Sequence, residues 1–158
     1  MTESGFTLVE LIAIILLVGI LAFVAVPRFS GPSLRVDAQA EQLASDIRYT
    51  QTLAMTQGDR FRINLTATGY QITSSTGAAT VAHPGTGSTN AVALNGVTLS
   101  GWSPPLTNNY LAFDSRGVPY SLVTSSTGLA ASATITLSGG GYARNLLVSP
   151  ETGRVVLP

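Results

Sequence analysis

The sequence predicts an α+β protein, in which a long N-terminal helix, hydrophobic and then amphipathic, packs on a small antiparallel β-sheet head. Two observations predict this class. Up to residue 58 the apolar residues recur at helical spacing, whereas from Arg60 onward short alternating segments are separated by Gly, Pro, Asn and Ser. Successive short strands joined by tight turns form antiparallel sheets, and a single long helix before them covers one face.

The composition limits the function classes. The 158 residues suit one domain with an appendage, and 8 basic residues, all Arg, balance 8 acidic ones. This charge balance argues against non-specific electrostatic binding of nucleic acid. The absence of cysteine excludes a disulfide framework and thiolate metal sites, and one histidine leaves little for acid–base or metal chemistry. We therefore expect no enzyme, no catalytic residue, no metal and no cofactor.

Most of the apolar excess lies in one run, Phe6 to Val26, whose 21 residues carry a single charge, Glu10. As a helix this run spans about 31 Å, close to the hydrocarbon thickness of a bilayer. A cleaved secretory signal fits poorly, since no basic residue precedes the run and Phe23 stands where the cleavage site needs a small residue. An ordinary membrane anchor explains the length but leaves the costly Glu10 carboxylate without a partner.

Residues 5–10 read GFTLVE and, with the apolar run, resemble the processing and assembly signal of type IV pilins and pseudopilins. The resemblance implies that a membrane-embedded prepilin peptidase cuts between Gly5 and Phe6 and that the new N-terminal Phe6 is methylated. It also implies that Glu10 attracts the terminal amine of a neighbouring subunit. In a low dielectric this attraction is strong and sets the stagger between subunits. The leader MTESG departs from the family pattern because it has no basic residue.

Four segments follow from this interpretation: a leader at 1–5, a transmembrane or filament-core helix at 6–27, an amphipathic helix at 28–58 and a β-rich globular head at 59–158. Pro27 and Pro32 are expected to bend or interrupt the helix, which resumes at Leu34 and ends at Gly58. Its predicted core stripe consists of Val36, Ala40, Leu43, Ile47 and Ala54, and its predicted surface residues are Arg35, Gln39, Gln42, Asp46 and Arg48.

Period-two alternation predicts strands at 61–65, 69–73, 110–114, 120–124, 133–138, 143–149 and 154–158. A turn around Thr68-Gly69 joins the first two strands. Residues 74–90 are rich in Ser, Thr and Gly and are expected to form a long exposed loop. Residues 91–99 suggest a hairpin, because Asn95-Gly96 is the favoured two-residue turn pair.

The segment from Ala40 to Ile63, the AFDSRGVP motif and the terminal LLVSPETGRVVL resemble minor pilins and pseudopilins of the GspH/FimT type. The minor pilins of mannose-sensitive haemagglutinin pili are a close rival. The resemblance implies a structural subunit that crosses the bacterial inner membrane once, with its head in the periplasm, and then enters a filament. Its partners would be other pilin subunits, the prepilin peptidase/methyltransferase and the inner-membrane assembly platform. Secretion, pilus and competence systems all remain open.

An alternative is a DNA-binding minor pilin for natural transformation, or an adhesive pilus subunit. Some FimT-type members bind DNA through C-terminal arginines, which points to Arg144 and Arg154. As solvated edge charges, the same two arginines would instead discourage sheet-to-sheet aggregation.

We interpret the other candidate residues as structural rather than catalytic or ligand-binding. His83 is predicted to be a loop histidine with no Asp or Cys near it in the sequence. Asp114 and Arg116 are interpreted as turn residues, and Trp102 and Tyr110 as partly buried sheet aromatics. The glycines at 139–141 lack the following Lys of a phosphate loop, and Asn64 begins a glycosylation sequon that often occurs by chance.

Overall fold

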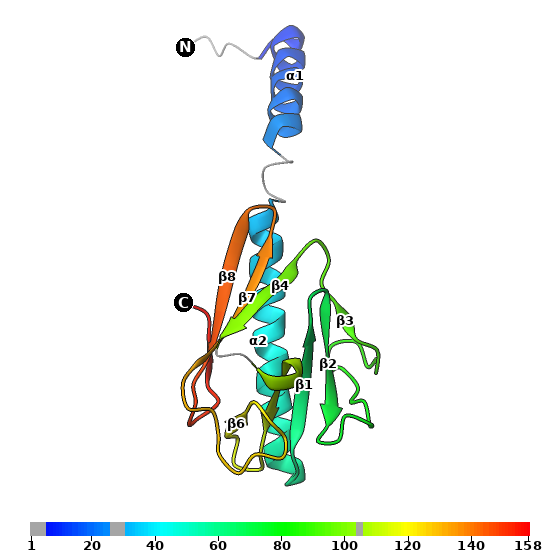
Figure 1. Ribbon diagram of the computed structural model, residues 1–158. Coiled ribbons are helices and arrows are strands. Elements are labelled where there is room, and N and C mark those ends of the chain that lie inside the picture. Colours follow the sequence, from blue (N-terminus) through cyan, green and yellow to red (C-terminus); the bar gives the residue numbers. More distant parts are fainter. Residues whose placement is uncertain (1–5, 26–30, 104–105) are drawn as a thin grey trace, which may run out of the picture.

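The computed structural model describes residues 6–25, 31–103 and 106–158 (Figure 1). Two helices, α1 (Leu8–Ala25) and α2 (Pro32–Gln57), come before the strands. The leader, Pro27 and the Pro-Pro pair at 104–105 lie outside the described residues. Helices followed by antiparallel strands confirm the predicted α+β class.

Helix α2 carries the predicted core stripe. Its apolar positions recur at intervals of three, four and seven residues and are fully buried: Val36, Ala40, Leu43, Ile47 and Ala54. Gly58 ends the helix with φ 68°, a left-handed conformation that glycine adopts without strain, and its N–H donates to the Ala54 carbonyl. Pro32 does not interrupt the helix. It opens α2, because the first helical turn has no use for the missing N–H.

The first sheet has the strand order β3-β2-β1-β5-β6 and is antiparallel throughout. Its strands are β1 (Phe61–Thr66), β2 (Gly69–Ser74), β3 (Val92–Ala93), β5 (Tyr110–Phe113) and β6 (Pro119–Tyr120). The β1–β2 hairpin closes at the Thr66–Gly69 pair, so its turn residues are Ala67 and Thr68, one position earlier than predicted. Of the predicted strand 120–124, only Tyr120 lies in a strand, as the second residue of β6.

The second sheet has the order β4-β7-β8-β9 and is also antiparallel. Its strands are β4 (Thr98–Ser103), β7 (Ala133–Gly139), β8 (Tyr142–Val148) and β9 (Val155–Val156). A short 3-10 turn, η2 (Thr107–Asn109), lies between β4 and β5 in the chain. The hairpin predicted for 91–99 is wrong. The Asn95-Gly96 turn carries the chain from β3 in the first sheet to β4 in the second.

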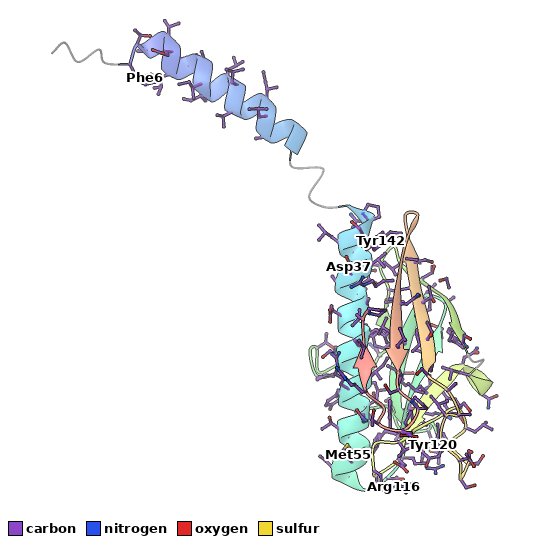
Figure 2. The ribbon with its side chains drawn as sticks, turned by 90° about the vertical axis from the view of Figure 1, so that its left-hand side faces the viewer. Phe6, Asp37, Met55, Arg116, Tyr120 and Tyr142 are labelled. Carbon is purple, nitrogen blue, oxygen red and sulfur yellow. The ribbon has the colours of Figure 1, made fainter. Side chains whose placement is uncertain are left out.

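Both sheets pack on one side of α2, which runs along the length of the head (Figures 1 and 2). The alternating inward residues of β1 and β7 are buried against the helix, as the strand patterns predict: Phe61, Ile63, Leu65, Ala133, Ile135 and Leu137. A smaller cluster of Tyr110, Ala112 and Tyr120 lies apart from this main core. The predicted partial burial is confirmed for Trp102 but is wrong for Tyr110, which is buried because it packs in this second cluster.

Candidate functional site

The N-terminus of α1 holds the predicted assembly residues. Thr7 precedes the helix and caps it: its Oγ1 accepts the N–H of Glu10 at 3.2 Å, and its carbonyl accepts the N–H of Leu11 at 3.1 Å. Glu10 is exposed in the first turn, where a carboxylate is favoured by the helix dipole. Phe6 is 72% exposed just before the cap. Gly5 lies outside the described residues.

From Leu8 to Leu21 the apolar side chains of α1 are exposed all around the helix. Their exposed fractions run from 43% at Ile14 to 75% at Val9. A continuous apolar surface of this kind marks a region that lipid or other protein covers. Over the described residues, however, none of the helices is long and apolar enough to cross a membrane.

Inside the head, three polar groups meet in the core between α2 and the first sheet. Asp46 of α2 is only 2% exposed, so its predicted surface position is wrong. Its Oδ2 accepts the Tyr70 hydroxyl of β2 at 2.5 Å and contacts Nε2 of His83 at 2.8 Å. Burial and the adjacent Asp46 carboxylate raise the pKa of Tyr70 above its ordinary value, which keeps this hydroxyl a donor.

His83 lies in the loop between β2 and β3, and only 7% of it is exposed. The Gly85 N–H donates to its Nδ1 at 3.1 Å, so Nε2 carries the proton and donates to Asp46. His83 thus lies in a loop, as predicted, but the prediction that no Asp lies near it is wrong: Asp46 contacts it, although 37 residues separate the two in the chain. His83 fastens the loop to α2, which gives the cluster a structural role.

The turn after β5 forms a second polar cluster. Asp114 Oδ1 accepts the N–H groups of Arg116 and Val118, and Oδ2 accepts the Arg116 guanidinium at 3.1 Å and the Tyr120 hydroxyl at 3.0 Å. Desolvation raises the pKa of Asp114, but the backbone donors, Arg116 and Tyr120 outweigh it, and the net shift is downward. The predicted turn role of Asp114 and Arg116 is confirmed.

The two C-terminal arginines occupy different settings. Arg144 of β8 lies with its Nε 3.4 Å from Oδ1 of Asp37 on α2, and about a third of its side chain is exposed. Arg154 is exposed in the segment before β9. Because Asp37 lies beside Arg144, Arg144 and Arg154 together offer less positive charge than two arginines without an acidic neighbour would. A DNA contact through them stays a prediction.

Within the described part of the chain there is neither a pocket nor a group of three or more metal-ligating side chains. Asn64, which begins the sequon, lies in β1, where its amide donates to the Gln71 carbonyl and the Thr73 hydroxyl. The Asn64 side chain therefore links β1 to β2.

The chain matches one known protein family over most of its length. The family model for the type II transport protein GspH matches residues 39–153. The chain belongs to the GspH family. The match covers α2 from Gln39 and nearly the whole head, and it confirms the resemblance that the sequence indicated. No curated protein sequence matches the chain significantly.

Solved structures share the fold of this GspH-family chain at low identity. The type IV minor pilin FimU of Pseudomonas aeruginosa is 18% identical, with a TM-score of 0.54, covering 77% of this chain and 91% of its own. The minor pseudopilin EpsH of the Vibrio cholerae type 2 secretion system is 14% identical, with a TM-score of 0.57, covering 78% of this chain and 96% of its own. Both confirm the pilin fold.

Proposed function

We propose that this chain is a minor pilin or pseudopilin, a structural subunit of a type IV pilus or a type II secretion pseudopilus. Membership of the GspH family carries the proposal. The exposed apolar surface of α1 supports it, because such a surface needs a cover of lipid or helices. The two structural neighbours are a minor pilin and a minor pseudopilin, which supports the same class here.

In this proposal the apolar run from Phe6 to Val26 first holds the chain in the inner membrane, with the head in the periplasm. Prepilin peptidase then cuts after Gly5, and the new amine of Phe6 is methylated. The run afterwards moves from lipid into the filament core or tip, where it packs against the helices of other subunits. Glu10 attracts the amine of a neighbouring subunit and thereby sets the axial stagger.

Processing is the first step to test. The full chain is co-expressed with a prepilin peptidase, and its N-terminus is determined by mass spectrometry. The wild type should yield a mature chain that begins with methylated Phe6. The Gly5→Leu variant should keep residues 1–5, because a branched side chain replaces the glycine at the cleaved bond. A Thr2→Ala variant, altered in the leader away from that bond, should be processed normally. A mature Phe6 N-terminus in Gly5→Leu would reject the proposed cleavage.

A further inference from the structure

Only a short segment of chain connects the end of α1 to the end of the head where α2 begins. Five residues, 26–30, separate Ala25 from Gly31. A chain advances by at most about 3.6 Å per residue, so the six steps from Ala25 to Gly31 span at most about 22 Å. Whatever surrounds the C-terminal end of α1 is therefore within reach of the first turns of α2.

Two of the four exposed large apolar side chains of the described head lie at this end. Leu34, in the first turn of α2, is 55% exposed, and Tyr142, beside the β7–β8 turn, is 38% exposed. The turn packs directly on the helix: a Cβ on Gly140 would come within 2.4 Å of the Pro32 Cβ. Figure 2 shows Tyr142 at the same end of the head as Asp37. We call Pro32, Leu34, Gly141 and Tyr142 the helix-start patch.

The charges around the patch suit a phospholipid surface. Arg35 follows Leu34 and is exposed, while Asp37 is already paired with Arg144. The surroundings thus add one cation to the aliphatic and phenolic groups of the patch. Aromatic rings with a polar tip gather at the headgroup level of a bilayer, and arginines there attract anionic headgroups.

We propose that the helix-start patch docks on the outer lipid interface of the membrane while α1 is inserted, which rests on the proposed function. Leu34 then reaches the headgroup–acyl boundary, the Tyr142 ring lies at the headgroup level and Arg35 contacts lipid phosphates. A second protein copy is the weaker occupant, because stable protein interfaces use about 20–30 residues a side. A lipid surface needs far less contact, since the inserted helix α1 holds the patch next to the lipid at a high effective concentration.

Depth-dependent fluorescence quenching tests this inference. The chain has one tryptophan, so Trp102→Phe provides a silent background for a single reporter. Tyr142→Trp reports on the patch. Met55→Trp, 52% exposed near the other end of α2, is the matched control, and Leu17→Trp reports on insertion of α1. The full chain is reconstituted in vesicles of phosphatidylethanolamine and phosphatidylglycerol, with a spin-label quencher either near the headgroup or deep in the acyl chain.

The headgroup-level quencher should remove about half of the Tyr142→Trp emission and leave Met55→Trp nearly unchanged. Adding Leu34→Ser should reduce the quenching of Tyr142→Trp by about half, because the patch then loses its aliphatic contact. Circular dichroism of each variant checks that the head stays folded.

The control variants distinguish a failure of the docking from a failure of the proposed function. If the deep quencher reaches Leu17→Trp but Tyr142→Trp is quenched no more than Met55→Trp, the docking is rejected and the proposed function stands. If Leu17→Trp is not quenched, membrane insertion fails and the docking fails with it. Emission from Tyr142→Trp that is shielded from an aqueous quencher but untouched by lipid quenchers would show a second copy on the patch, which also rejects the docking.

Discussion

At the residue scale, Asp46 is a buried carboxylate that joins three parts of the head. A buried carboxylate is costly unless donors surround it, and here the Tyr70 hydroxyl and His83 Nε2 supply them. The three residues come from a helix, a strand and a loop, so the cluster holds three parts of the head together. Because its donors and acceptor are matched, removing one member leaves the others without their partner.

Tyr70→Phe tests this cluster. The variant keeps the ring in the core but removes the donor to Asp46. The free energy of unfolding should fall by about 1.5–3 kcal/mol, the usual contribution of a hydrogen bond to a charged group. Tyr49→Phe is the control: Tyr49 lies on α2 and its hydroxyl has no hydrogen-bond partner among the described residues. It should change stability by less than about 0.5 kcal/mol. Equal losses in urea unfolding would contradict the role of the cluster.

Asp114 predicts a pH dependence. Its pKa in the folded head lies below the ordinary value of 3.8, so its ionised form contributes stability above that pH. This stability is lost as the pH falls from about 4 through the folded pKa, where the carboxylate takes up a proton. Urea unfolding at a series of pH values should therefore show that the free energy of unfolding falls less at acid pH in Asp114→Asn than in the wild type. Parallel curves for the two proteins would count against this assignment.

At the element scale, Gln51 of α2 joins turns that follow strands of different sheets. Its Nε2 donates to the Gly117 carbonyl at 2.8 Å and to the Thr152 carbonyl at 2.7 Å. Space there is tight, since a Cβ on Gly153 would lie 2.5 Å from the same nitrogen. The two motifs that indicated the family, AFDSRGVP and LLVSPETGRVVL, thus meet at one side chain of the helix.

Gln51→Ala should cost about 1–3 kcal/mol of unfolding free energy, because two carbonyls lose their donor. Gln42→Ala provides the matched control, since Gln42 is exposed on the same helix and should change stability by less than about 0.5 kcal/mol. Thermal unfolding of both variants measures the difference. A Gln51→Ala variant as stable as Gln42→Ala would show that the turns do not depend on the helix.

At the scale of the whole molecule, the chain combines a folded head with a helix whose apolar surface is exposed. The head buries most of its apolar residues within itself, whereas the apolar side chains of α1 from Leu8 to Leu21 are uncovered. Assembly with other subunits would cover this surface, and Glu10 would choose the register, since apolar contacts alone are not directional.

Glu10→Ala should leave a cleaved, membrane-inserted subunit that enters filaments poorly, with at least about a tenfold loss of incorporation, the equivalent of 1.4 kcal/mol. The amine of the neighbour then lacks its counter-charge in a low dielectric. Incorporation is measured by immunoblot of sheared filaments against total subunit. Val9→Ala, which trims an adjacent exposed apolar residue, is the control. Normal incorporation of Glu10→Ala would reject the role of Glu10.

Features that depend on local periodicity could be predicted from the order of the amino acids. The spacing of Val36 to Ala54 fixes which face of α2 is buried, Gly58 is needed where the chain leaves the helix, and alternation places most strands. The specific run from Gly5 to Val26 and the later motifs indicated the family. All of these features depend on residues close together in the chain. The periodicity of helices and strands relates such residues directly to the buried face of an element or to the point where it ends.

Features that depend on contacts between residues far apart in the chain emerged from the three-dimensional fold. It divided the strands into two sheets, placed Asn95-Gly96 in the crossing between them and buried Asp46 beside His83. Polar residues are assigned to the surface because an unpaired buried charge is costly, but partners far away in the sequence can remove that cost. The pairing of Asp46 with Tyr70 and His83 spans 24 and 37 residues, and a local pattern cannot show it.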